Sequence, residues 1–288
     1  MDKMKAKRIL TFTALFIALT AFCVWVYWGN TSIQTTEIII SSEKIPEPFG
    51  GFTFVQVSDL HNAEFGHDQI RLLSAVKNAS PDLIAVTGDL IDVNHTDTVK
   101  AMEFIYEAVE IASVYYITGN HEAWYDRYDE LKQLMIEAGV IILDDDVTSI
   151  EHNGASVRLI GLSDPDFTGA DSYEVKGMTD TKLKTLLSGI SDNDEYIILL
   201  SHRPELFDVY AANNIDLVLS GHAHGGQVRL PFIGGIVAPD QGFFPKYTEG
   251  IHEKSMTSMV VSRGLGNSII PVRINNRPEL VVIKLEPY

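Results

Sequence analysis

The chain has 288 residues, a formal net charge of −17, 45% hydrophobic residues and a single cysteine. This length allows one or two domains with a large core, and one cysteine excludes both a disulfide framework and a thiolate metal site. Nucleic acid requires a basic surface, so we expect no nucleic-acid partner, and bound cations would have to hold any phosphate substrate.

The first 28 residues have the pattern of a membrane anchor. Residues 1–8 contain four basic side chains and one acidic side chain, and residues 9–28 contain no charge. About 20 apolar residues span a bilayer as a helix, and the positive-inside rule predicts a cytoplasmic N-terminus. Trp25, Tyr27 and Trp28 stand where interfacial aromatic residues are expected. We therefore predict a single-pass protein of the cell membrane whose remaining chain is extracytoplasmic.

Three alternatives to an uncleaved anchor fit an apolar run of this length. A cleaved signal peptide usually has a shorter apolar core and a small-residue cleavage site, whereas this run ends in the bulky residues 24–28. Lipid attachment at Cys23 would need a small preceding residue, and Phe22 is bulky. A buried helix of a soluble protein is the third alternative. The uncleaved anchor is our prediction, and cleavage in the mature protein stays open.

Strand and helix patterns alternate through the first half of the remaining chain. A strand pattern at 35–41 and a turn-rich link at 43–51 come first. Strand patterns then occupy 52–59, 82–89 and 113–120, and helix patterns occupy 68–79, 98–109 and 129–139. Such alternation indicates α/β layers around a central sheet.

The second half combines hairpin and α/β patterns. Residues 140–162 read as short hairpin strands, helix patterns follow at 179–190 and 204–213, and strand patterns follow at 195–202 and 215–222. The tail from about 229 is rich in strand patterns and glycine. A single parallel sheet does not explain the hairpins, so we predict a sandwich of two sheets. We divide the chain into a basic segment (1–8), a transmembrane anchor (9–28), a linker with the first strand (29–44) and one domain (45–288).

Five strand patterns end in side chains that can bind metal. These are Asp59 and His61, Asp89, Asn120 and His121, His202, and His222 and His224. Sites in open α/β sheets form beyond the carboxyl ends of strands, so short turns can bring these groups together. A lone strand-end Asp is usually a turn former, and a lone His is usually packed or on the surface. Recurrence at five strand ends instead indicates a metal site, whose mixed N and O ligands suit Mn, Fe or Zn.

In this order the residues resemble the motifs of the calcineurin-like metallophosphoesterase superfamily. The motifs are Asp59-Leu60-His61, Gly88-Asp89, Gly119-Asn120-His121-Glu122, His202 and Gly221-His222-Ala223-His224, and the match runs from residue 53 to about 230. Glu122 stands where many members have Asp, and both residues occur in the family. The resemblance implies two mixed sheets in a sandwich flanked by helices (αββα), with 45–288 as the catalytic domain. The extension after His224 is similar to a membrane-anchored or exported bacterial branch.

The resemblance also implies two divalent metal ions and a role for each motif residue. One ion would bind Asp59, His61 and His224, the second would bind Asn120, His202 and His222, and Asp89 would bridge both. His121 would act near the leaving-group oxygen as general acid or transition-state donor. The implied reaction is in-line attack on phosphorus by a metal-bridging hydroxide, while the cations neutralise charge on the phosphoryl oxygens.

Other segments bear on the substrate. The glycine-rich segments 225–231 and 262–268 contain Gln227, Arg229 and Arg263, which are candidates for substrate contacts; the alternative is structural turns with surface arginines. Residues 163–178 form either a loop at the mouth of the site or an exposed connection.

The predicted location favours phosphodiesters or pyrophosphates of cell-surface lipids or wall polymers. One alternative is a nucleotide or phosphomonoester phosphatase. Another is a non-catalytic metal-binding scaffold, which the non-ligand His121 disfavours, and a dinuclear peptidase is disfavoured by the ordered motifs. The sequence does not indicate an oligomeric state.

Overall fold

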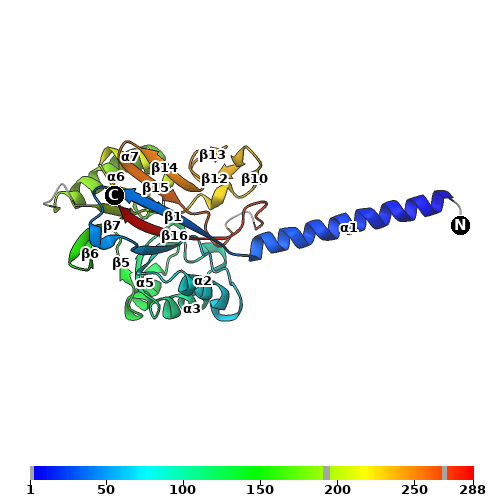
Figure 1. Ribbon diagram of the computed structural model, residues 1–288, viewed down its shortest axis with the longest axis horizontal. Coiled ribbons are helices and arrows are strands. Elements are labelled where there is room, and N and C mark those ends of the chain that lie inside the picture. The colour runs from blue at the N-terminus through cyan, green and yellow to red at the C-terminus, as the bar shows by residue number, and fades with distance from the viewer. Residues whose placement is uncertain (1–2, 191–194, 268–270) are drawn as a thin grey trace.

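A long helix stands apart from one folded body in the computed structural model, which describes residues 3–190, 195–267 and 271–288 (Figure 1). This helix, α1 (Lys3–Thr31), extends beyond the predicted anchor at both ends. Its segment Lys7–Thr31 is long and apolar enough to cross a membrane, and none of its most apolar stretch is buried against the body. Residues 1–2 of the predicted basic segment lie outside the described residues.

The first sheet has six strands in the order β1-β16-β2-β3-β4-β5. They are β1 (Gln34–Ser42), β2 (Thr53–Val57), β3 (Leu83–Thr87), β4 (Ser113–Ile117), β5 (Ile141–Ile142) and β16 (Glu279–Pro287). Strands β2 to β5 are parallel, and β16 pairs antiparallel with β2 and parallel with β1. The strand that we grouped with the linker is thus an edge strand of this sheet.

The second sheet also has six strands, in the order β14-β15-β9-β8-β7-β6. They are β6 (Asp146–His152), β7 (Ala155–Gly161), β8 (Ile197–Leu200), β9 (Leu217–Ser220), β14 (Gly250–Lys254) and β15 (Thr257–Val261). Two small hairpins pair β10 (Arg229–Leu230) with β11 (Gly234–Gly235) and β12 (Val237–Ala238) with β13 (Gly242–Phe243).

The hairpin prediction for residues 140–162 is correct for β6 and β7 and wrong for β5. Strands β6 and β7 are antiparallel neighbours, whereas β5 pairs parallel with β4 in the first sheet. The reason is the crossover through helix α5 (Tyr128–Glu137), because a helical connection brings the chain back parallel to the preceding strand.

Helices cover the outer faces of both sheets. The α-helices of the body are α2 (Ile70–Asn78), α3 (Thr98–Ala108), α4 (Asn120–Ala123), α5, α6 (Ser172–Leu187) and α7 (Phe207–Ala212). Short 3-10 turns occupy η1 (Glu47–Phe49), η2 (His67–Gln69), η3 (Val93–His95), η4 (Pro165–Thr168), η5 (Pro204–Leu206) and η6 (His224–Gly226). Helix α6 begins before the predicted residue 179, because the Asp171 side chain accepts from the backbone N–H groups of Tyr173 and Glu174.

The buried apolar residues form three layers, as expected for an αββα sandwich. In β2, Phe54 faces the core between the sheets, whereas Val55 and Val57 face the core under α2, α3 and α5. In β8, Leu199 packs in the core that contains α6 and α7 residues, and its neighbours face the central core. Alternate strand residues point to opposite faces of a sheet, so each sheet is apolar on both faces. Helices cover its outer face, and the other sheet covers its inner face. The predicted fold class is therefore confirmed.

The strand directions place one edge of the first sheet beside the end of α1. Thr36 in β1 and Gln56 in β2 both pair with Val281 of β16, and β1 and β2 run in opposite directions. Strand β1 therefore begins at the edge where β2, β3 and β4 end, on the side from which α1 leaves the body (Figure 1). The end of β9 lies at the same edge, since the Gln56 Nε2 donates to the Ser220 carbonyl at 2.9 Å.

The end of α1 is held against the body by a group of polar contacts. Asn30 Nδ2 donates to the Arg273 carbonyl at 2.8 Å, and the Arg273 backbone N–H donates to Asn30 Oδ1 at 2.7 Å. The Arg277 guanidinium lies 4.6 Å from the centre of the Trp28 ring, and Arg277 Nη2 donates to the Ile33 carbonyl. These contacts fix the direction in which the helix leaves the body.

Candidate metal centre

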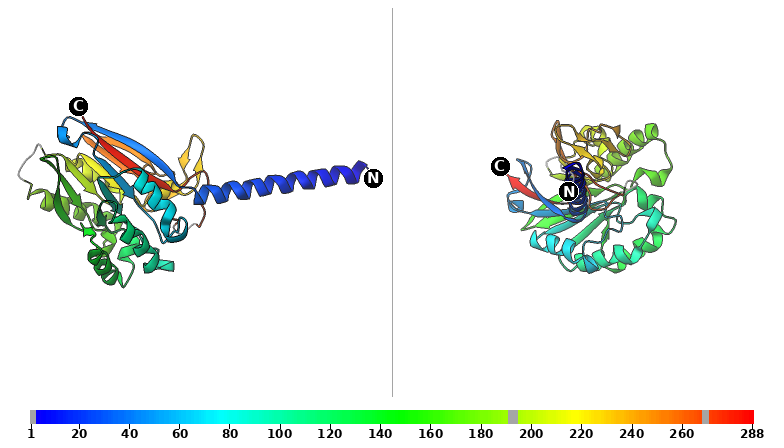
Figure 2. Two further views of the ribbon diagram at one scale, coloured as in Figure 1. Left: turned by 60° about the horizontal axis from the view of Figure 1, so that its bottom comes forward. Right: turned by 90° about the vertical axis from the view of Figure 1, so that its right-hand side faces the viewer.

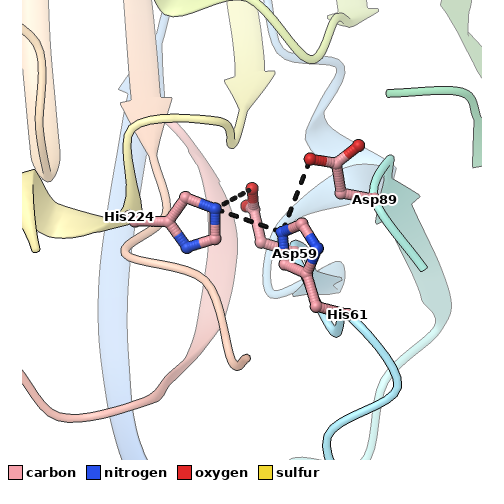
Figure 3. A group of neighbouring side chains, drawn as sticks. All are labelled: Asp59, His61, Asp89 and His224. Carbon is pink, nitrogen blue, oxygen red and sulfur yellow. Dashed lines mark hydrogen bonds and ion pairs between the residues drawn. The ribbon is translucent and has the colours of Figure 1, made fainter. Parts of the chain in front are cut away.

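The strand-end residues of both sheets meet at this common edge. In each of two groups of side chains, the potential ligand atoms all lie within 4.8 Å of one another. The first group is Asp59, His61, Asp89 and His224, and the second is Asp89, His202 and His222. Figure 3 shows the first group, with the imidazoles of His61 and His224 turned toward the two carboxylates. Asp89 belongs to both groups, as a bridging ligand would.

One oxygen of Asp89 is the atom that the two groups share. Asp89 Oδ2 lies 3.5 Å from His61 Nε2 and 3.2 Å from His202 Nε2. The other oxygen, Oδ1, accepts from the backbone N–H of His121 at 2.9 Å. The hydrogen bond orients the carboxylate so that Oδ2 faces both clusters of imidazoles.

The residues present fit two cations. His61 Nε2 lies 3.1 Å from His224 Nε2, and His202 Nε2 lies 3.2 Å from His222 Nδ1, so ring nitrogens face each other in pairs. Two neutral imidazoles whose lone pairs face each other cannot form a hydrogen bond, whereas a cation between them can accept both lone pairs. Asn120 Oδ1 is buried and has no hydrogen-bond partner, although buried polar atoms normally have one. Imidazole, carboxylate and amide donors without sulfur suit divalent ions of the Mn, Fe or Zn kind.

Burial keeps most of these imidazoles neutral. It lowers the pKa of His61 to about 3 and that of His222 to about 4, and it holds the pKa of His224 well below its usual value. Burial opposes the charged form of His202 too, but the Asp89 carboxylate outweighs it and raises the pKa of His202 to about 10. The neutral ring carries the lone pair that binds a metal, so the site favours cations over protons at most of its nitrogens.

Outer hydrogen bonds set which nitrogen of two histidines faces the centre. His202 Nδ1 lies 2.7 Å from the Thr87 carbonyl and donates to it, which leaves Nε2 free to bind a metal. His222 Nε2 lies 2.9 Å from Asp240 Oδ2, which leaves Nδ1 toward His202. Asp240 had no motif to mark it, because it stands in the glycine-rich tail well beyond His222 in sequence.

Arg203 is a second functional candidate that sequence analysis missed, although it directly follows His202. Its Nη1 lies 2.5 Å from Asp240 Oδ2, and its Nε donates to Asp164 Oδ2 at 2.6 Å. This pairing brings the segment 163–167 beside His222, so the segment lies near the metal centre. A cavity of about 260 Å³ opens there, and Asp166, Arg203 and Asp240 contribute to its lining.

Glu122 connects two of the motif turns. Its buried carboxylate accepts from the backbone N–H groups of Gly119 at 2.8 Å, Asp89 at 2.9 Å and Leu90 at 2.9 Å. Burial raises the pKa of Glu122 to about 7. The Glu at this motif position thus holds the turn after β3 against the turn after β4.

The motif turns are tight and strained. Asp59, His61, Asp89, His222 and His224 all have positive φ angles, between 45° and 66°. Such conformations cost on the order of 1–3 kcal/mol each and cluster at functional sites. Gly221 illustrates the crowding, since an added Cβ would lie 1.9 Å from Ser58 Oγ.

His121 lies beside the ligand groups but in neither of them. Its Nδ1 accepts from the Val93 backbone N–H at 3.1 Å, so the neutral ring carries its proton on Nε2. The ring centre lies 4.4 Å from that of His61 at 80°. His121 is therefore a hydrogen-bond donor next to the predicted metal site.

The three candidates for substrate contacts make contacts within the protein. Gln227 Nε2 donates to the Val272 carbonyl at 3.1 Å, Arg229 pairs with Glu249, and Arg263 Nη2 lies 3.0 Å from Glu279 Oε1. These contacts are those of loop-holding residues, and a role in substrate binding stays a prediction. Ser268, the last residue of the segment 262–268, lies outside the described residues.

A sandwich of two mixed sheets with a cluster of buried His and Asp side chains at their common edge is the arrangement of a protein that binds metal ions. The calcineurin-like phosphoesterase family matches the chain over residues 52–226. The chain therefore belongs to this family and is a metal-dependent phosphoric ester hydrolase, which confirms the resemblance found in its motifs.

Three relatives illustrate the range of the family. The chain is 31% identical to the uncharacterized metallophosphoesterase YkuE of Bacillus subtilis over 266 residues, 88% of this chain and 86% of that protein. It is 25% identical to the phosphodiesterase YaeI of Escherichia coli over 81% of this chain and 82% of YaeI. It is 29% identical to a zebrafish transmembrane protein with a metallophosphoesterase domain, over 95% of this chain and 62% of that protein.

Proposed function

We propose that the enzyme is a membrane-anchored phosphodiesterase or pyrophosphatase that acts on lipid or wall phosphoesters at the cell surface. The observation that carries this proposal is the position of the ligand cluster at the sheet edge beside the end of α1. A site on that side of the body is close to phosphoesters at a membrane surface. The diester class is further supported by the Escherichia coli relative, which is named a phosphodiesterase.

In this proposal each motif residue has one task. Asp59, His61 and His224 would hold one cation, Asn120, His202 and His222 would hold the other, and Asp89 would contribute to both sites. When bound, the two cations polarise the phosphoryl group and make water a nucleophile at neutral pH. His121 donates a hydrogen bond from Nε2 to the oxygen that leaves phosphorus, since its Nδ1 accepts from the Val93 N–H.

The proposed topology has a cytoplasmic N-terminus and an extracytoplasmic catalytic domain. The basic residues before the apolar helix support it through the positive-inside rule. Protease added to intact cells whose wall has been removed should degrade the catalytic domain. Degradation only after lysis would overturn this orientation.

Hydrolysis by the full chain in detergent with Mn²⁺ tests the reaction class. We expect faster hydrolysis of bis-p-nitrophenyl phosphate than of p-nitrophenyl phosphate. Faster hydrolysis of the monoester would overturn the diesterase proposal in favour of a phosphomonoesterase. Bound metal without turnover of either compound would favour a scaffold.

The role of His121 is tested with a diester whose alcohol is a poor leaving group. His121→Ala should reduce kcat by roughly 10²–10³-fold, as for loss of a hydrogen-bond donor to charge that develops in the transition state, with metal content unchanged. The matched control is His95→Ala, because His95 is an exposed histidine of the nearby turn η3. An unchanged kcat for His121→Ala would exclude it as the hydrogen-bond donor to the leaving oxygen.

A further inference from the structure

The two small hairpins after the metal centre expose an unusual set of large apolar side chains. We define the hairpin surface as Leu230, Phe232, Ile233, Phe243 and Phe244, whose exposed fractions are 44%, 109%, 60%, 77% and 67%. Single exposed apolar residues are common, but five of them on two hairpins that follow each other in the chain are typical of an interaction site.

The backbone beneath the hairpin surface is well ordered by hydrogen bonds. The Ile236 N–H donates to the carbonyls of Gly226 and Val228, at 3.1 and 2.9 Å, and the Phe244 N–H donates to the Ile236 carbonyl at 2.8 Å. The exposed side chains are thus presented by a fixed framework, which lowers the entropic cost of binding a partner.

The hairpin surface lies next to the metal centre. Strand β10 follows directly after η6, which contains His224, and the loop between β12 and β13 carries Asp240, which contacts His222. The hairpins stand on the side of the body from which α1 leaves, both in Figure 1 and in the left view of Figure 2. Whatever the hairpin surface contacts therefore lies close to the end of the apolar helix and to the site.

Charge also distinguishes this segment from the rest of the chain. In residues 229–246, Arg229 pairs with Glu249 and Asp240 pairs with Arg203, so the charge that this segment exposes is that of Lys246, whereas the whole chain carries −17. An anionic lipid surface repels most of this body but not these hairpins. Exposed Phe, Leu and Ile side chains beside a lysine are typical of segments that enter the bilayer interface.

We propose that the hairpin surface docks on the lipid bilayer beside α1, so that the metal centre faces phosphoesters in the membrane. Docking rests on the proposed membrane anchoring, and it narrows the substrates to lipid-borne phosphoesters. The partner is the bilayer surface, which the apolar side chains enter while Lys246 lies at the level of the headgroups.

A fluorescent label on the hairpin surface tests docking without reference to activity. In a Cys23→Ser background, Phe243→Cys is labelled with an environment-sensitive dye, and the full chain is reconstituted in vesicles of phosphatidylethanolamine and phosphatidylglycerol. The matched control is Met256→Cys, because Met256 is 81% exposed in the turn between β14 and β15, at the opposite end of β15 from the site. We expect a blue-shifted emission and several-fold stronger quenching by nitroxide-labelled lipids at 243 than at 256.

Equal quenching at the two positions would overturn the proposal. A blue-shifted emission at 243 without quenching by the nitroxide-labelled lipids would overturn it too, because a protein surface would then cover the hairpins. Lipid-dependent quenching at 243 supports docking even if the vesicles show no hydrolysis of a lipid phosphodiester, and that absence would count against the proposed substrate alone. The double variant Phe232→Ser with Phe243→Ser should slow hydrolysis of a vesicle-borne diester several-fold and leave bis-p-nitrophenyl phosphate turnover unchanged.

Discussion

Replacement of Asp89 by asparagine removes the one atom that both ligand groups share. Asp89 Oδ1 accepts from the His121 N–H at 2.9 Å, so the amide oxygen of Asn takes that position. The amide NH₂ then replaces Oδ2, which lies near His61 and His202. The opposite rotamer would set NH₂ against the His121 N–H, donor against donor. The first orientation loses a metal ligand at both sites, and the second keeps only a neutral amide oxygen there while it sets two donors against each other.

The expected loss follows from counting the affected sites. A residue that only positions a metal ligand costs roughly 10–100-fold in metal affinity when it is lost. Asp89→Asn removes a direct ligand from two sites, so roughly 10²–10⁴-fold is a lower bound for the combined loss. His224→Ala affects a single group and should cost less.

The assay measures bound metal and turnover of bis-p-nitrophenyl phosphate in the full-length chain. Asp82→Asn is the matched control, because Asp82 precedes the same strand β3 at its other end, where its carboxylate accepts from the Thr53 N–H at 2.8 Å. We expect full metal content for Asp82→Asn and nearly none for Asp89→Asn. Full metal content and activity in Asp89→Asn, or a larger loss in His224→Ala, would refute the bridging assignment.

Three further variants or treatments probe the site. Gly221→Ala places a Cβ 1.9 Å from Ser58 Oγ and should lower the free energy of unfolding by roughly 1–3 kcal/mol in urea, whereas Gly177→Ala, which meets nothing within 4 Å, should not. Glu122→Ala removes the acceptor of four backbone N–H groups and should cost roughly 4–12 kcal/mol at about 1–3 kcal/mol each; an unchanged urea midpoint would contradict that sum. Chelation should lower Tm and added Mn²⁺ should restore it, since a ligand at 100 times its Kd stabilises the native state by about 2.7 kcal/mol; a Tm indifferent to chelator would argue against cations in the native site.

Much of the candidate site can be predicted from the sequence, because each motif lies within a few residues of a strand end. The strand pattern gives the position of Asp59 or Asp89, and the topology of α/β sheets gives their common edge. Asp240 and Arg203 escaped this reasoning for different reasons. Asp240 reaches His222 through two irregular hairpins with no periodic pattern, and Arg203 looked like an ordinary residue beside a motif histidine.

The apolar run of α1, the alternation of strands and helices, and the order of the metal-binding motifs were determined by the sequence itself, because hydropathy, periodicity and turn chemistry are local properties. Only the tertiary structure decided that β5 joins the first sheet and that β1 is an edge strand of that sheet. It also decided that the ligand cluster lies on the same side of the body as the end of α1. Strand pairing joins segments far apart in the chain, such as Thr36 and Val281, and its register depends on how whole faces are buried.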